Sequence, residues 1–201
     1  MSRSSNNLND FVLLTEKKGV DIIASSLFLV DLRGLSEKRL SQLIPTLDDY
    51  DFVIIDTQPT YDNLVLNAYY PADFIITPIH LSLFDFNTAK FLQSKMQTEV
   101  GKHDNWYLHV NGFNHRFEDS KAGNQREYLE LFKNEFDNIT PVPSWFPWTA
   151  NMRQIIDRNM FLAKKEGVAN SICNEQLHAS VCSLAECFFE DGENFPLVDC
   201  F

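Results

Sequence analysis

Short apolar runs alternate along the chain with segments of helical periodicity. Residues 51–56, 74–79 and 106–111 are apolar almost without a break, which is typical of strands that are covered on both faces. Residues 20–25 form a shorter run that is rich in β-branched residues, and residues 141–148 are extended and broken by prolines. The pattern therefore predicts strands at the first four places and an edge strand or a loop at the last.

Apolar side chains recur every three or four positions between these runs, as they do on one face of a helix. The helices that this spacing predicts cover residues 8–18, 36–47, 60–70, 87–98, 124–136, 149–164 and 170–190. Pro45 is expected to bend or end the second of them. Strands that alternate with helices indicate an α/β fold with a mainly parallel sheet. Residues 1–7 form a polar tail, and residues 8–201 are expected to form a single domain.

Composition and the N-terminal sequence indicate the cellular location of the protein. The chain has 201 residues, of which 44% are hydrophobic and 22% charged, as in ordinary globular domains. No apolar run approaches the roughly 20 residues that a membrane-spanning helix needs. The N-terminus is too polar and too acidic for a secretory signal. We therefore expect a cytoplasmic protein.

The chain is acidic as a whole but has one basic segment. A formal net charge of −11 and a pI of about 4.8 argue against a surface that binds nucleic acid everywhere. Residues 151–165 are the exception, because they carry four basic residues against a lone Asp157: Arg153, Arg158, Lys164 and Lys165. These four are candidates for contact with DNA. The alternative is a solvated helix face that balances nearby acids.

Ligands of open α/β sheets bind at the carboxyl ends of the strands. The residues expected at these ends are Asp56, Thr57, Gln58, Pro59, Pro78, His80, Asn111 and Asn114. An aspartate that ends an apolar strand can hold Mg²⁺ through water and leave the metal open to phosphate oxygens. Asp56 is therefore a candidate metal ligand, and the alternative is a helix cap or turn residue. For His80 and Asp85, packing is favoured over an acid–base pair.

Several motifs follow one another between residues 50 and 92. Residues 56–59 end a predicted strand, residues 64–68 have the form Leu-x-x-Asn-Ala, residues 72–78 run from Ala-Asp to Pro, and Phe84 stands where the next helix opens. Their order and spacing resemble the central region of the ParA/MinD family, the deviant Walker ATPases that partition plasmids and chromosomes. Weaker similarity covers nearly all of the remaining chain.

The resemblance implies a P-loop NTPase-like fold of the SIMIBI class, with ATP and Mg²⁺ as cofactors. By this likeness Asp56 is the catalytic, magnesium-ordering aspartate. Thr57, Gln58 and Pro59 belong to the switch that senses the γ-phosphate, although Gln58 replaces the first proline of the usual pair. The residues that resemble the contacts to the adenine base are Asn111, or one register on Asn114, together with Pro147 and Trp148.

The N-terminal part of the family pattern, with its first strand, phosphate loop, first helix and second strand, has no counterpart in these 201 residues. The phosphate loop of the family, Lys-Gly-Gly-x-Gly-Lys-Thr, is absent, and the sole Gly-Lys pair at residues 101–102 lacks the upstream glycine. We therefore do not expect this chain alone to cradle a triphosphate. Three explanations stay open: a fragment of a working ATPase, a truncated relative that completes its sheet in another way, or a scaffold that now only binds.

The expected function is that of a ParA-like partition protein, which segregates a plasmid or chromosome as a dimer or together with a longer ParA-type subunit. A centromere-binding protein and non-specific DNA are the further partners that the resemblance implies. The alternative is a non-catalytic interaction or regulatory module that keeps the ParA-like scaffold and binds its partner by strand addition at an exposed sheet edge. The acidic C-terminus argues against membrane binding.

Overall fold

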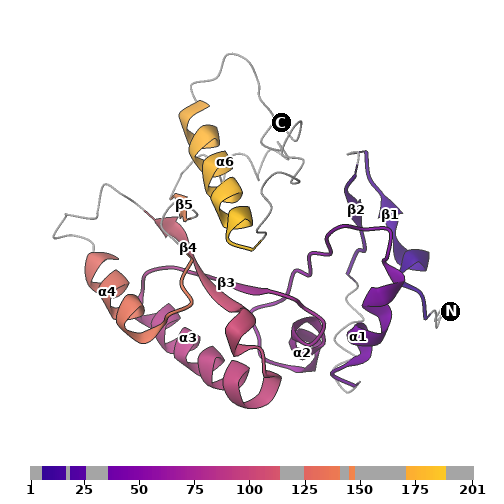
Figure 1. Ribbon diagram of the computed structural model, residues 1–201, viewed down its shortest axis with the longest axis horizontal. Coiled ribbons are helices and arrows are strands. Elements are labelled where there is room, and N and C mark those ends of the chain that lie inside the picture. Colours follow the sequence, from indigo (N-terminus) through magenta and orange to yellow (C-terminus); the bar gives the residue numbers. More distant parts are fainter. Residues whose placement is uncertain are drawn as a thin grey trace. The chain divides into compact units, whose positions relative to one another are not determined.

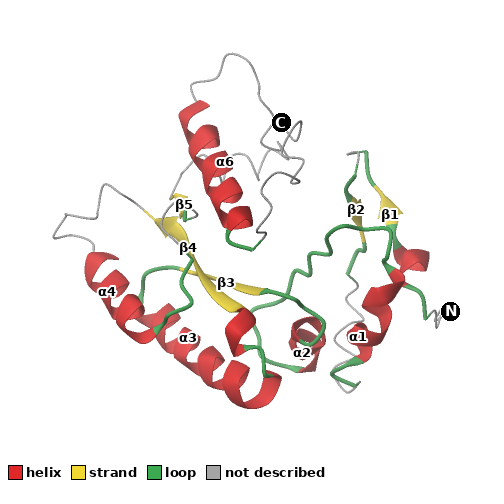
Figure 2. Ribbon diagram, viewed as in Figure 1, coloured by secondary structure: helices red, strands yellow, loops and turns green. Residues whose placement is uncertain are grey.

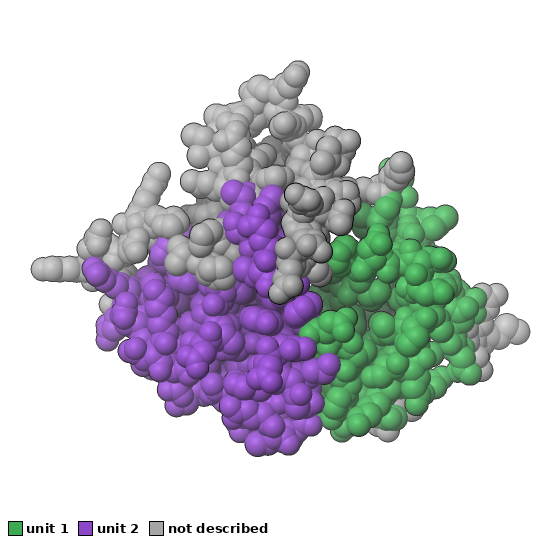
Figure 3. Space-filling view, viewed as in Figure 1, with its two compact units in different colours: residues 1–73 green, residues 74–201 purple. Residues whose placement is uncertain are grey.

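A computed structural model describes residues 6–16, 19–25, 36–113, 125–140, 145–147 and 171–188. The chain divides into two compact units, residues 1–73 (unit 1) and residues 74–201 (unit 2), which are coloured separately in Figure 3. That all of residues 8–201 form one domain stays a prediction. No helix within the described ranges has both the length and the apolar character needed to cross a membrane.

The described elements of unit 1 are short (Figure 1). They are the 3-10 helix η1 (Leu8–Phe11), the strands β1 (Leu13–Leu14) and β2 (Asp21–Ile22), the helix α1 (Arg39–Leu43), the 3-10 helix η3 (Ile44–Thr46) and the helix α2 (Asn63–Tyr69). The predicted helix over residues 36–47 is confirmed in its place. It changes to 3-10 geometry at Pro45, as expected.

The helix predicted over residues 8–18 is wrong. Only its first turn forms, capped by the side chain of Asn7, and β1 then pairs antiparallel with β2 so that Leu13 lies opposite Ile22. The turn between the strands contains Gly19 at a φ of 77°, a left-handed conformation that glycine adopts at no steric cost. Backbone pairing with a later segment has overridden the helical spacing of the leucines.

The described residues of unit 1 combine a small apolar cluster with polar contacts. The buried apolar residues described in unit 1 are Leu47, Val65, Leu66 and Ala68. Asn67 of α2 joins α2 to the start of α1, because its Oδ1 accepts from the backbone N–H of Leu40 at 3.0 Å and its Nδ2 donates to the carbonyl of Ser36 at 3.0 Å. The asparagine of the Leu-x-x-Asn-Ala motif thus acts as a clamp between two helices.

The buried strand predicted over residues 51–56 is also wrong. Residues 52–58 lie in the loop between η3 and α2 (Figure 2), and Ile54 is 93% exposed. Residues 53–57 make no main-chain hydrogen bond within the part of the chain that the structure describes. An apolar run becomes a strand only where another strand pairs with it, and here no described strand does.

Unit 2 has the expected parallel sheet, in the order β3–β4–β5. Its described elements are β3 (Ile75–Ile79), α3 (Leu83–Lys95), the π-helical turn η4 (Met96–Val100), the 3-10 helix η5 (His103–Asn105), β4 (Trp106–Phe113), α4 (Gln125–Glu135), β5 (Phe146–Pro147) and α6 (Ser171–Glu186). The predicted strands over residues 74–79 and 106–111 are confirmed. The helix predicted over residues 149–164 lies outside the described residues.

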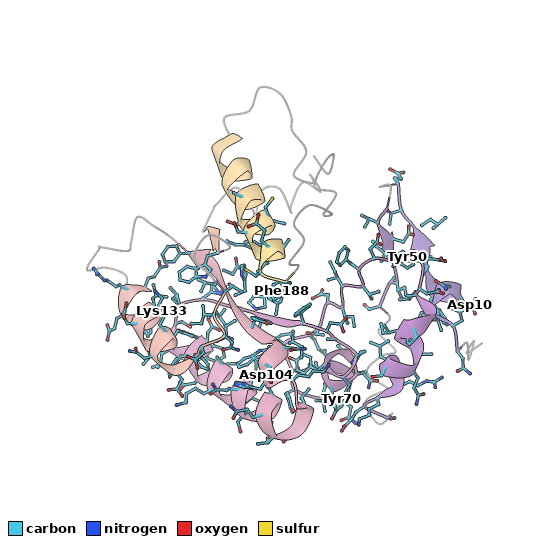
Figure 4. The ribbon with its side chains drawn as sticks, viewed as in Figure 1. Asp10, Tyr50, Tyr70, Asp104, Lys133 and Phe188 are labelled. Carbon is cyan, nitrogen blue, oxygen red and sulfur yellow. The ribbon has the colours of Figure 1, made fainter. Side chains whose placement is uncertain are left out.

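The two faces of β4 carry different side chains, because successive residues of a strand point to opposite faces. On one face, Trp106 packs edge-on against Phe136, which follows α4, with their ring centroids 6.3 Å apart. Phe86 of α3 packs in the same way on Phe132 of α4 at 5.3 Å. On the other face, Tyr107 meets Phe188 at the end of α6 at 4.9 Å, and Figure 4 labels Phe188 at this place. Helices therefore cover both faces of the sheet.

A chain of buried polar contacts joins β4 to β5 and α6. The ring of His109, which is only 3% exposed, lies with its Nδ1 3.1 Å from Oγ1 of Thr140. Trp145 donates from its indole N–H to the carbonyl of Thr140 at 2.7 Å, and the hydroxyl of Ser180 donates to the carbonyl of Trp145 at 2.9 Å. Buried groups of this kind stabilise a fold when they are paired and cost free energy when they are not.

His109 is held in its neutral form. Burial lowers its pKa from the ordinary 6.5 to about 4, because transfer of a charged imidazolium out of water is unfavourable. Nε2 is buried without a hydrogen-bond partner in the described part of the chain. A neutral ring that donates from Nδ1 leaves only a lone pair at Nε2, whereas a protonated ring would leave an N–H and a charge there.

Truncation of Phe132 to alanine should destabilise unit 2 strongly. The side chain is fully buried between α3 and the sheet, and removal of a buried phenyl ring costs about 3–5 kcal/mol. The neighbouring Leu131 is 37% exposed, so Leu131→Ala is the matched control, with an expected loss of about 1 kcal/mol or less. Urea unfolding followed by tryptophan fluorescence measures both. Similar losses for the two variants would contradict this description of the core.

The buried His109 should make stability depend on pH between about 6.5 and about 4. In this window the unfolded chain binds a proton that the folded chain excludes, so stability falls as the pH falls, by up to about 3 kcal/mol. Urea unfolding at about pH 7 and about pH 4.5 measures the loss. His109→Gln should remove most of it, while His80→Gln, at an exposed position, should not. An unchanged loss in His109→Gln would show that other groups cause it.

Candidate functional site

The carboxyl edge of the sheet in unit 2 brings two of the predicted base contacts together. β4 and β5 pair in parallel so that Asn111 lies opposite Phe146, and Phe113 lies opposite Pro147. The side chain of Asn111 is partly exposed. Asn111 and Pro147 therefore stand on neighbouring strands at the edge where ligands of open α/β sheets bind. Asn114 and Trp148, the other predicted base contacts, lie outside the described residues.

Gly112 changes the direction of β4 at this edge. Its φ of 73° is left-handed, and the register between β4 and β5 shifts between Asn111 and Phe113. A bulge of this kind interrupts the regular alternation of side chains between the two faces of the strand and so changes the direction of the flanking side chains. Glycine adopts such a conformation at no steric cost, so Gly112 permits the bulge, but the strand predicted over residues 106–111 ended one residue before it.

The predicted metal and switch residues lie in unit 1. Asp56 is exposed in the loop before α2 and makes no hydrogen bond or ion pair with a described residue. Thr57, Gln58 and Pro59 are exposed as well. This differs from the expected geometry, in which a paired strand fixes the aspartate at its end.

The rest of the switch segment forms a turn built on Asp62. Oδ1 of Asp62 caps α2 by accepting from the backbone N–H groups of Leu64 and Val65 at 3.0 and 3.3 Å. Oδ2 accepts from Gln58 at 3.4 Å and from the hydroxyl of Thr60 at 3.3 Å. The carboxylate that organises this segment is thus Asp62, which sequence reasoning missed. The signal was present, since Asp directly precedes a helical period.

Asp85 has a structural role at the start of α3. The hydroxyl of Ser82 accepts from the backbone N–H of Asp85 at 3.1 Å, and Oδ2 of Asp85 accepts from that hydroxyl at 3.0 Å and from the backbone N–H of His80 at 3.1 Å. This is similar to a capping box, except that the carboxylate accepts from the N–H of His80, two residues before the N-cap Ser82, and not from the N–H of Ser82 itself. Asp85 therefore contacts the main chain of His80 rather than its imidazole, and the His80 side chain is exposed rather than packed.

The described residues do not fit a magnesium–nucleotide site of the family's kind. Such a site needs several successive backbone N–H groups around the phosphates, and the left-handed glycines Gly19, Gly101 and Gly112 each stand alone. It also needs a fixed carboxylate for the metal, and Asp56 ends no strand.

The basic residues Arg153, Arg158, Lys164 and Lys165 lie outside the described residues. Their grouping is a property of the sequence. Within the described residues, no group of three or more histidine, cysteine, aspartate or glutamate side chains is placed to hold a metal ion.

Comparison with known proteins gives the family. A family described as an AAA domain matches residues 2–108, more than half of the chain. A Mycobacterium tuberculosis protein of uncharacterised function is 24% identical over 165 residues, which cover 69% of this chain and 52% of the relative. The ParA family protein pGP5-D of the Chlamydia muridarum virulence plasmid is 24% identical over 174 residues, which cover 83% of this chain and 61% of the relative.

These curated relatives are longer than the chain, which spans between about half and two thirds of their length. Among solved structures, a Borrelia burgdorferi protein described as a putative plasmid partition protein bound to AMPPNP has a similar fold. Its TM-score is 0.65 at 16% identity, with 90% of this chain and 70% of that chain covered. The fold expectation, an α/β scaffold of the P-loop NTPase type, is confirmed. The chain belongs to the AAA-domain family, as a ParA-like member.

Proposed function

We propose that the chain works as a ParA-like partition protein in the segregation of a plasmid or chromosome. The observation that carries the proposal is the ordered set of motifs over residues 50–92 within a fold like that of a plasmid partition protein. Its partners are a second copy of the chain or a longer ParA-type subunit, a centromere-binding protein, and DNA. The single domain expected over residues 8–201 is part of the proposal, since the family match runs across the boundary between units 1 and 2.

In this proposal the chain supplies only part of a nucleotide site. Asn111 and Pro147 border the base, and Asp56 and the residues that follow it belong to the phosphate side. The Borrelia protein of similar fold is described as bound to AMPPNP, which supports ATP as the nucleotide class of the scaffold. The absence of a glycine-rich loop from the sequence argues that this chain does not hold ATP unaided.

Calorimetric titration of the 201-residue chain with ATP and Mg²⁺ tests this division. We expect no saturable heat at millimolar nucleotide, because no described backbone loop can cradle the phosphates. Asp56→Ala is titrated alongside, with Asp48→Ala as the matched exposed control. Saturable binding that Asp56→Ala removes and Asp48→Ala keeps would show a phosphate site built from other residues and would restore the ATPase interpretation.

Contact with DNA is assigned to the basic group at residues 153–165. Lys164→Ala combined with Lys165→Ala should weaken binding to any double-stranded DNA and lower the slope of log K against log salt by about two, because two phosphate contacts are lost. Lys102→Ala combined with Lys133→Ala removes the same charge elsewhere and should leave the slope unchanged. Gel-shift titrations over a range of salt measure both. Equal effects would mean that only net charge matters.

The second candidate is a non-catalytic interaction or regulatory module on the same scaffold. The observation that favours it is the exposure of the apolar residues 52–54, because monomeric proteins rarely leave contiguous apolar residues in solvent without a binding role. A stable complex with a longer ParA-type protein, together with absent DNA binding, would favour this candidate over the first.

A further inference from the structure

The helix α6 lies along β4 in unit 2 and is attached to the sheet through two described side chains. The hydroxyl of Ser180 donates to the carbonyl of Trp145 at 2.9 Å, directly before the residue of β5 that lies opposite Asn111. Near the other end of β4, Phe188 packs edge-on against Tyr107, with the ring centroids 4.9 Å apart. α6 therefore runs antiparallel to β4 and covers the face that carries Tyr107.

The spacing of these contacts places the first half of α6 beyond the end of β4. The rise from Ser180 to Phe188 along a helix is about 12 Å, close to the roughly 13 Å from Tyr107 to Asn111 along a strand. Residues 171–179 belong to the same helix, so they continue past the carboxyl edge of β4, as Figure 1 shows. The edge that carries Asn111 thus lies beside the first turns of α6.

His109 lies under α6 between the two contacts. It points to the same face as Tyr107 and Asn111, because residues two apart in a strand share a face. Its Nδ1 lies 3.1 Å from the hydroxyl of Thr140, and its ring packs edge-on against Phe146. Nε2 is buried without a described hydrogen-bond partner. Protonation would therefore place an N–H and a positive charge beneath α6 with no described acceptor.

The groups around His109 favour its neutral form. Pro78 lies opposite it on β3 and Phe146 of β5 contacts its ring, and neither carries a charge. The titratable neighbour on its own face of β4 is Tyr107. The titratable residues of α6 whose side chains are described are Cys182, Glu186 and Cys187. Burial is the cause of the lowered pKa of His109, so protonation is favoured only where the ring gains contact with water.

Hydrogen bonds also join His109 to α6. Thr140, which contacts the imidazole, accepts at its carbonyl from the indole N–H of Trp145, and the carbonyl of Trp145 accepts from Ser180. β3 and β4 are held by main-chain pairs along five residues of each strand, whereas these contacts of α6 are made by side chains. α6 is therefore the element that separates from His109 at the lowest free energy.

We propose that α6 is a proton-sensitive cover at the carboxyl edge of the sheet, docked while His109 is neutral and released when the ring is protonated. Release opens the side of the edge that carries Asn111 and Pro147 and leaves β3 and β4 paired. The inference uses neither nucleotide nor DNA, so it stands apart from the proposed partition function.

Hydrogen exchange of the 201-residue chain, followed by mass spectrometry of its peptides, tests the proposal. Between about pH 7.5 and about pH 5.5, protection of the α6 amides should fall about tenfold, after correction for the intrinsic effect of pH on exchange. The factor follows from a pKa of 6.5 for a solvated ring and about 4 for the docked state. Low concentrations of urea should change the exchange of α6 less than that of α3, because release of one helix exposes little surface.

Variants identify the titrating group. His109→Gln should remove the pH dependence of α6 protection, because an amide does not titrate, whereas His80→Gln, at an exposed position, should keep it. Ser180→Ala should lower α6 protection by the same factor at both pH values, since it removes a docking contact and leaves the imidazole. Circular dichroism at about pH 7.5 confirms that the variants fold. The wild-type comparison of α6 with α3 decides the question if His109→Gln does not.

Three results would overturn the proposal. They are equal protection of α6 at the two pH values, an unchanged pH dependence in His109→Gln, and exchange of α6 with the same urea dependence as α3. The last would show that the whole unit opens rather than one helix. None of these results bears on the DNA or nucleotide titrations, so failure of this inference and failure of the proposed function are distinguishable.

Discussion

Unit 2 depends on β4, which is paired along both edges and covered on both faces. β3 pairs with one edge from Trp106 to Val110, while residues 138–140 and β5 pair with the other. Trp106 and Leu108 are fully buried, and His109 faces the opposite side among Thr140 and Phe146. Because every backbone group of a buried strand needs a partner, the position of β4 fixes the positions of its neighbours, and with them the place of Asn111.

The described elements of unit 1 are held together by fewer buried contacts than those around β4. The strands described in unit 1 are two residues long, few of its described apolar residues are buried, and side-chain hydrogen bonds such as those of Asn67 join its helices. Its most apolar segment lies in solvent. Single hydrogen bonds contribute about 1 kcal/mol each, whereas burial of one large apolar side chain contributes about 2 kcal/mol. Coverage of Val53 and Ile54 would therefore change the stability of unit 1 by an amount comparable with its internal contacts.

The sequence predicts the sheet of unit 2 well and unit 1 poorly. The apolar runs that became β3 and β4 and the run over residues 51–56 look alike, but whether such a run pairs depends on tertiary partners that periodicity does not contain. For the same reason the leucines at residues 8–18 suggested a helix where a hairpin forms. Within the candidate site, the family resemblance implied that Asn111 and Pro147 lie near each other, and the parallel pairing of β4 with β5 accounts for it. The contact of His109 with Thr140, 31 residues away, was not, because no local pattern links residues so far apart.

The two oxygens of Asp62 have divided tasks. One caps the first turn of α2, and the other receives Gln58 and Thr60 from the segment before it. A rearrangement that withdraws this carboxylate from Gln58 and Thr60 also disturbs the cap, so the turn and the first turn of α2 order or melt together as one cooperative unit. Asn67 joins α2 to the backbone at the start of α1. A conformational change at Gln58 that disturbs α2 would therefore also affect the contact between α2 and α1. A signal at this loop would thus appear as a change in helix docking.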